Sequence, residues 1–273
     1  DAFDLRTHKL RPHRGQIQTA KNIIALTEGS TFMTDQGDLR VQDAYALRCV
    51  PQVHGASKDA VNYVKEEVKI EINSVTDNPI IFDNSDVISG GNFHGEPMAL
   101  SFDFLGIAVS EIANISERRL ERLINYQLND LPPFLAKNGG LNSGFMITQY
   151  AAAALVSENK ILAHPASVDS IPSSANQEDH VSMGTIAARK GLEIVNNTAR
   201  VLATELMAAC QAIDFRKGLK LGKGTEEAYK AVRNKVDFIE KDKIMYKDLD
   251  KCEGLVTSGE LLRSVEEKVK LEI

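Results

Sequence analysis

The sequence predicts an all-α protein, a bundle of long helices with one small β-hairpin. Three stretches repeat apolar residues at helical spacing, over residues 100–128, 144–163 and 178–215. The last is far longer than the usual helix of about 11–12 residues. Pro132 and Pro165 end the first two stretches, because proline lacks the N–H that a helix interior needs. Helices of this length are typical of a bundle in which they run side by side.

Further elements are expected around this bundle. Two β-rich runs within residues 80–88, separated by a polar turn, predict the hairpin. We divide the chain into residues 1–217, a helical core with its loops, and residues 218–273, a peripheral lysine-rich helical segment. Shorter helices are expected over four stretches: residues 12–26, 57–72, 225–240 and 258–269.

Composition excludes several classes of protein. The net charge is −6, from 32 basic and 38 acidic residues, which argues against nucleic acid as a partner. No apolar run reaches about 18 residues, so we expect no membrane span. Cys49, Cys210 and Cys252 are odd in number and far apart, which favours a reducing compartment, the cytoplasm. We expect no signal peptide, and the first residue, Asp1, suggests part of a longer chain.

The motifs of common catalytic sites are missing from the sequence. Six histidines occur without His-Glu-x-x-His or paired Cys-x-x-Cys spacing, so no metal site is expected. There is no Gly-x-Ser-x-Gly elbow for a nucleophilic serine and no glycine-rich phosphate loop. What remains is a set of amides, carboxylates and aromatic groups between long helices. Such groups suit proton transfer and carboxylate recognition.

The richest polar stretch is residues 164–184. Seven acid, amide or imidazole side chains fall within its first 17 residues, and two prolines interrupt helix formation there. We expect Ser173, Ser174 or Asn176 to cap the following helix, with Glu178 in its first turn. The alternative is a polar loop with a capped helix and no chemistry.

Two more stretches combine unlike functional groups. Tyr45 and Arg48 are three residues apart, so a helical turn would place them on one face. Taken alone, they could equally be a core tyrosine and a surface cation. Residues 89–97 place three glycines around Asn92, Phe93 and His94, which lets the backbone approach a ligand or a neighbouring helix.

These stretches resemble the histidine ammonia-lyase branch of the aromatic amino acid lyases, in order and in spacing. The resemblance covers essentially all 273 residues but matches only the C-terminal half, or slightly more, of that family's polypeptide. The segments that carry it are Val41-Gln-Asp-Ala-Tyr-Ala-Leu-Arg-Cys49, Asn73-Ser-Val-Thr-Asp-Asn-Pro79, Ser89-Gly-Gly-Asn-Phe-His-Gly-Glu-Pro97, Leu141-Asn-Ser-Gly-Phe-Met146 and residues 164–184.

The resemblance implies a long-helix bundle of the aromatic ammonia-lyase type, a homotetramer that eliminates ammonia from L-histidine to give trans-urocanate. It also implies an electrophile, methylidene-imidazolone, formed from an Ala-Ser-Gly triplet. This chain has no such triplet, since Ile88, Asn142 and Thr257 precede its three Ser-Gly pairs. We therefore expect the electrophile in an absent N-terminal half, and no lyase activity from the chain alone.

The resemblance also implies roles for individual residues. Arg48 matches the residue that pairs with the substrate carboxylate, and Gln42 matches a neighbouring amide of the site. Tyr45 matches an active-site tyrosine that transfers a proton or orients the substrate. Phe93 matches a wall beside the electrophile, and Glu178 matches the carboxylate near the imidazole or the β-carbon. We thus predict Tyr45 and Glu178 as catalytic and the other three as substrate-binding.

Two alternatives stay open. The chain can be a helical scaffold or assembly fragment without chemistry of its own, which the missing triplet supports. Among enzymes, a phenylalanine or tyrosine ammonia-lyase or an aminomutase is the second choice. The motifs Asn92-Phe-His-Gly-Glu96 and Asn176-Gln-Glu-Asp-His180 favour the histidine branch.

Overall fold

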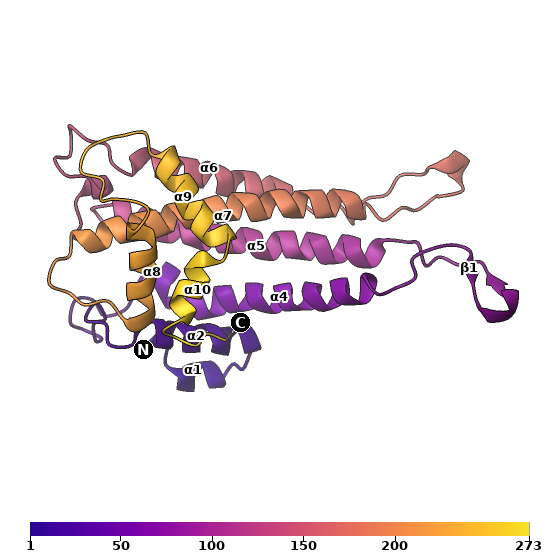
Figure 1. Ribbon diagram of the computed structural model, residues 1–273, viewed down its shortest axis with the longest axis horizontal. Coiled ribbons are helices and arrows are strands. Elements are labelled where there is room, and N and C mark those ends of the chain that lie inside the picture. The colour runs from indigo at the N-terminus through magenta and orange to yellow at the C-terminus, as the bar shows by residue number, and fades with distance from the viewer. Residues whose placement is uncertain (273) are drawn as a thin grey trace.

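The computed structural model of the chain describes residues 1–272. Long helices run side by side in an elongated bundle, and shorter helices pack across one end of it (Figure 1). The elements are α1 (Leu5–Lys9), α2 (Arg14–Thr27), α3 (Tyr45–Arg48), α4 (Val50–Glu71), β1 (Ile80–Ile81), η1 (Asp83–Ser85), β2 (Val87–Ile88), α5 (Glu96–Ile124), η2 (Pro133–Leu135), α6 (Met146–Leu162), η3 (Ser174–Asn176), α7 (Gly184–Asp214), α8 (Lys223–Arg233), α9 (Tyr246–Thr257) and α10 (Glu260–Glu266).

The helices α4, α5, α6 and α7 form the long bundle, and each contacts α5 or α7 (Figure 1). Small residues let α5 and α7 approach closely. A Cβ atom at Gly106 of α5 would lie 3.1 Å from Cδ1 of Ile194 on α7, so a larger residue there would force the side chain of Ile194 to shift. Ala203 and Ala208 are also buried along α7. The two helices are therefore held as one rigid unit, because well-packed interiors deform little.

The main apolar core lies where the C-terminal helices pack against α5 and α7. Leu120, Phe145 and Met207 are almost fully buried in it. Val232 of α8 and Leu255 of α9 are each 0% exposed and belong to the same core. Burial of such a side chain stabilises the fold by about 1.5–3 kcal/mol. The division of the chain after residue 217 stays a prediction, but α8 and α9 contribute to the shared core.

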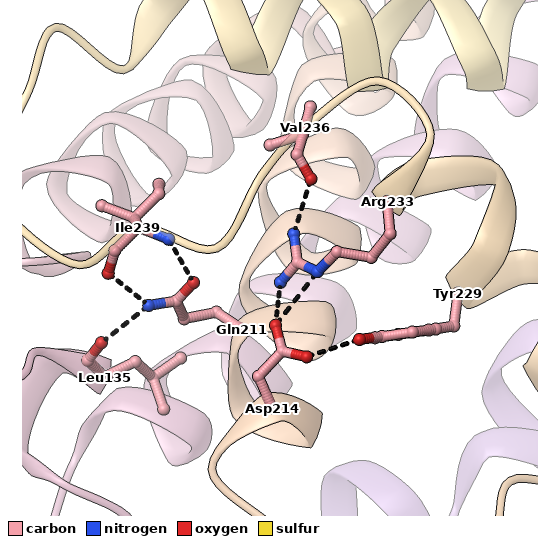
Figure 2. A network of polar contacts seen from close by, with 7 residues as sticks. All are labelled: Leu135, Gln211, Asp214, Tyr229, Arg233, Val236 and Ile239. Atoms are coloured by element: carbon pink, nitrogen blue, oxygen red, sulfur yellow. Dashed lines mark hydrogen bonds and ion pairs between the residues drawn. The ribbon is translucent and has the colours of Figure 1, made fainter.

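Polar side chains fix the same region (Figure 2). The buried side chain of Gln211 donates to the carbonyl of Ile239 at 2.8 Å and accepts from its N–H at 3.0 Å. It also donates to the carbonyl of Leu135 at 3.3 Å. Nearby, Arg233 of α8 pairs with Asp214 at the end of α7 at 2.6 Å. These contacts tie the segment after α8 to the central bundle.

Most of the predicted elements are confirmed. The three long helices are α5, α6 and α7, and the hairpin pairs Ile80 with Ile88 in the antiparallel sense. Two short helices were predicted with different bounds: α8 ends at Arg233, and α10 begins at Glu260. The helix α9 was not predicted.

Two predictions about helix starts were wrong. The predicted helix over residues 57–72 begins at Val50, because Pro51 occupies its first turn, where no N–H is needed. The longest helix begins at Gly184 and not at residue 178. Three consecutive residues, 174–176, have positive φ values of 48°, 56° and 68°, which a right-handed helix does not allow. Ser173, Ser174 and Asn176 therefore do not cap α7, and Glu178 is not in its first turn.

By length and composition, α5 is apolar enough to cross a membrane. Within the bundle it packs against α4, α6 and α7, and its buried residues include Ala113 and Leu120. A core helix of a soluble protein meets the same length and composition test. The apolar character of α5 is thus accounted for by its place in the bundle.

Candidate active site

The predicted residues Gln42, Tyr45 and Arg48 lie together at one end of the bundle. Tyr45 and Arg48 begin and end the single turn α3, directly before α4. A guanidinium Nη1 of Arg48 donates to Oε1 of Gln42, so the amide holds the guanidinium in place. The side chain of Tyr45 is 75% exposed, which leaves its phenol group free to contact a ligand or another chain. We call these three residues the α3 cluster.

A cavity of about 600 Å³ opens beside the α3 cluster. Gln42 and Arg48 line it, together with Arg119 and Arg122 of α5 and Glu205 of α7. A cavity of this size accommodates a small-molecule ligand. Arg119 is paired with Glu205, whereas Arg48 forms no ion pair among the described residues and could offer its two parallel donors to the two oxygens of a carboxylate.

Arg119 and Glu205 form an ion pair in the cavity wall, with Nη2 and Oε2 2.8 Å apart. Ser116 donates a second bond to the same carboxylate, and Arg119 donates to Nε2 of His54 at 3.3 Å. Burial, together with the positive charges of Arg119 and Lys58, lowers the pKa of His54 to about 4. His54 is therefore neutral near pH 7 and accepts the bond from Arg119.

Phe93 lies at the other end of the bundle, on the loop of residues 89–95 between β2 and α5, which we call the Phe93 loop. Its ring is 57% exposed and thus available as a wall for a ligand. The loop is tied to the preceding segment by Asn78, whose Oδ1 accepts from Ser89 Oγ at 3.0 Å and from the N–H of Gly90 at 2.8 Å. The exposed aromatic group therefore stands on an anchored loop.

Glu178 lies on residues 163–183, the segment between α6 and α7, which we call the Glu178 loop. Its carboxylate accepts from Ser173 Oγ at 2.5 Å, and the backbones of the two residues form an antiparallel bridge. The three residues with positive φ lie between them. Such conformations cost about 1–3 kcal/mol each and persist only where the surroundings enforce them. Glu178 is thus placed by a tight turn, and the helix of α7 plays no part in it.

The Glu178 loop is anchored to the bundle at its beginning. Oδ2 of Asp103 on α5 accepts from the N–H of Ser167 at 2.7 Å. Lys190 of α7 lies 3.2 Å from the same carboxylate. The bonds from Ser167 and Lys190 lower the pKa of Asp103 despite the opposing effect of burial, so the carboxylate stays charged and keeps both contacts.

The structure does not bring all five predicted residues together. The α3 cluster precedes α4, whereas Phe93 and Glu178 precede the beginnings of α5 and α7 at the opposite end of the bundle (Figure 1). The 22 residues of α4 separate the two ends by about 33 Å, at 1.5 Å per residue. No small substrate can touch both groups within one copy of the chain. The five assignments stay predictions.

No sequence pattern indicates a site at His54, Arg119 or Glu205. Arg119 and Glu205 lie within regular helical patterns, where a charged residue is typical of a solvated face, and His54 precedes the helix predicted over residues 57–72. Only the packing of α4, α5 and α7 brings the three side chains together. The sequence alone therefore contains no pattern that would predict this group of three side chains.

Comparison with known proteins identifies the family. The profile described as "Aromatic amino acid lyase" matches residues 1–234. The chain is 74% identical over its whole length to histidine ammonia-lyase of Clostridium tetani, and covers 54% of that protein. It is 66% identical over 99% of its length to histidine ammonia-lyase of Alkaliphilus oremlandii, again covering 54%. The chain thus spans about half the length of these relatives.

Solved structures agree on the fold. The crystal structure of histidine ammonia-lyase from Trypanosoma cruzi superposes with a TM-score of 0.91 at 46% identity, covering 98% of this chain and 51% of that one. Tyrosine aminomutase from Streptomyces globisporus superposes with a TM-score of 0.94 at 36% identity, covering 99% and 56%. The predicted fold type is confirmed, and the chain belongs to the aromatic amino acid lyase family.

Proposed function

We propose that this chain is part of a histidine ammonia-lyase, which eliminates ammonia from L-histidine to give trans-urocanate. The observation that carries the proposal is 74% identity over the whole chain to a protein of that name. The fold alone does not separate it from an aminomutase, because the TM-scores are 0.91 and 0.94. Sequence identity favours the histidine enzyme, since the chain is 46% identical to the structure of that enzyme and 36% identical to that of the aminomutase.

In this proposal the α3 cluster binds the amino acid part of the substrate. Arg48 provides the two-point contact to the carboxylate, and Gln42 holds the guanidinium in the orientation that this contact requires. Tyr45, exposed on the same turn, orients the substrate or transfers a proton. Rigid placement of such groups lowers the barrier because the reacting atoms need no further ordering.

Glu178 and Phe93 complete the site from the other end of the bundle. The β-proton of histidine is weakly acidic, so its removal needs a placed base, and we assign Glu178 to the imidazole or to that proton. Phe93 forms an aromatic wall, which its exposure on an anchored loop supports. Methylidene-imidazolone, which we expect from the other half of the full-length protein, would supply the electrophile that activates the substrate for the loss of ammonia.

We further propose that the site is shared between copies of the protein in a homo-oligomer, a tetramer. A single copy keeps the α3 cluster and the pair of Phe93 and Glu178 at opposite ends of α4, whose 22 residues span about 33 Å, which is too far for one substrate. The central helices also expose large apolar side chains, of the kind that oligomers bury. These exposed residues include Phe104, Ile107, Tyr150, Leu192 and Val195.

We also propose a cytoplasmic location, which the three free thiols support.

The test uses the full-length lyase, meaning this chain joined to the half that its relatives have and it lacks. Urocanate absorbs in the ultraviolet, so its formation from L-histidine can be followed directly. We expect turnover of L-histidine by the full-length lyase and none by the isolated chain. Faster turnover of L-tyrosine or L-phenylalanine would replace the proposal by the alternative lyase or aminomutase. Urocanate formation by the isolated chain at an enzymatic rate would contradict the need for the other half.

A further inference from the structure

Two histidine side chains join the Phe93 loop to the Glu178 loop. The rings of His94 and His180 are stacked, with centroids 5.4 Å apart and planes 19° from parallel. Nε2 of His94 lies 3.2 Å from the carbonyl oxygen of His180 and 3.3 Å from Nδ1 of the same residue. Among residues 1–272, all hydrogen bonds found between these two loops belong to this pair.

The hydrogen-bond partners assign donor and acceptor roles to the nitrogens of both rings. The backbone N–H of Glu96 donates to Nδ1 of His94 at 3.3 Å, so Nδ1 carries no proton and Nε2 carries one. The Nε2–H of His94 is shared between the carbonyl oxygen and Nδ1 of His180, which both act as acceptors. His180 therefore keeps its proton on Nε2. One imidazole donates and the other accepts, a pairing that two stacked apolar side chains could not reproduce.

Each histidine lies close in the sequence to one of the two predicted site residues. His94 follows Phe93 in the chain, and His180 is two residues after Glu178. The backbones also meet where α5 and α7 begin. A Cβ atom at Gly184 would lie 3.3 Å from the carbonyl oxygen of Gly95. The two loops are thus in contact at their bases and linked by the histidines further out.

We propose that His94 and His180 are positioning residues, which fix Phe93 relative to Glu178 so that the ring and the carboxylate face the same substrate. The proposal rests on the proposed lyase function, in which both residues contact the substrate. The histidines themselves act through their neighbours. A displacement of about 1 Å in such a site can reduce turnover on the order of 10²-fold.

The test compares matched variants of the full-length lyase. His94→Leu and His180→Leu remove the contact and keep the apolar part of the side chain. His94→Gln retains a donor near the position of Nε2, and His180→Asn retains an acceptor near that of Nδ1. His164→Leu is the control, because His164 is exposed on the Glu178 loop but is not part of the pair.

Turnover and hydrogen exchange are both measured. We expect each leucine variant to lower kcat by about 10- to 100-fold with little change in KM, and the double variant to be no worse than either one. The glutamine and asparagine variants should recover most of kcat. Amide exchange in both loops should become roughly 2- to 12-fold faster in the leucine variants, as expected for one lost neutral hydrogen bond. His164→Leu should change neither quantity.

Three results would overturn the proposal. Independent losses that multiply in the double variant would show that the two histidines do not act as a pair. Faster exchange with unchanged kcat would reduce the pair to a structural contact. Unchanged exchange in both loops would show that the pair does not hold them. An unmodified full-length lyase without activity on L-histidine would refute the proposed function instead, and the exchange measurement would still decide whether the pair joins the loops.

Discussion

Lowering the pH from 7 to 5 should destabilise the chain through His54. This histidine is neutral in the folded protein because burial and the nearby charges of Arg119 and Lys58 lower its pKa from 6.5 to about 4. In the unfolded chain it takes up a proton below pH 6.5. Its contribution to stability is therefore fully present above pH 6.5 and is lost as the pH falls toward 4.

The size of the effect follows from the two pKa values. A difference of one pKa unit corresponds to about 1.4 kcal/mol, so the full loss is roughly 3 kcal/mol, reached below pH 4. At pH 5 about 2 kcal/mol of the free energy of unfolding should be gone. The pKa values of the buried carboxylates Asp103 and Asp248 are lowered below 3.8, so these groups stay charged in this range and add no comparable change.

The assay is urea unfolding of the chain and of its His54→Gln variant at pH 7 and pH 5. Glutamine can still accept the bond from Arg119 but does not titrate. The free energy of unfolding should fall by about 2 kcal/mol more in the unmodified chain than in the variant, since the other histidines contribute equally to both. An equal loss in the two proteins would refute the argument that His54 is neutral and buried.

Three further predictions concern single side chains. Gln211→Met should lower the free energy of unfolding by about 2–4 kcal/mol, because it leaves buried backbone groups without partners, whereas the exposed Gln127→Met should change it by less than about 0.5 kcal/mol; urea unfolding measures both. In the full-length lyase, Arg48→Lys should raise KM for L-histidine, since lysine loses a two-point contact worth about 1.5–3 kcal/mol; an unchanged KM and kcat would remove Arg48 from the site. Glu178→Gln should lower kcat by about 10²-fold or more while Asp179→Asn leaves it nearly intact; equal losses, compared alongside melting temperatures, would reject Glu178 as catalytic.

The sequence was sufficient for the regular part of the fold. Long apolar periods bounded by Pro132 and Pro165 predicted α5 and α6, because these signals are local. The start of α7 was misjudged, since Glu178 and its neighbours have the composition of a helix start. The turn that holds them elsewhere depends on backbone conformations at residues 174–176, which composition does not specify.

The candidate site was only partly predictable. The pairing of Gln42 with Arg48 lies within seven residues of sequence, so the bend at Gln42 and the turn of α3 are enough to form it. The contact between His94 and His180 joins positions 86 residues apart. Only the packing of α5 against α7 brings their loops together, and no local pattern records it. The same holds for the separation of the five site residues between opposite ends of the bundle.

The most direct test of the account is complementation between two inactive forms of the full-length lyase, Arg48→Ala and Glu178→Gln, co-expressed in equal amounts. If each site takes Arg48 from one copy and Glu178 from another, about a quarter of the sites in mixed oligomers should hold both native residues. Urocanate formation should then recover to about a quarter of the unmodified rate, whereas each variant alone stays near its low level. A mixture no more active than the single variants would show that Arg48 and Glu178 do not meet across copies, and would contradict a site shared between the two ends of the bundle.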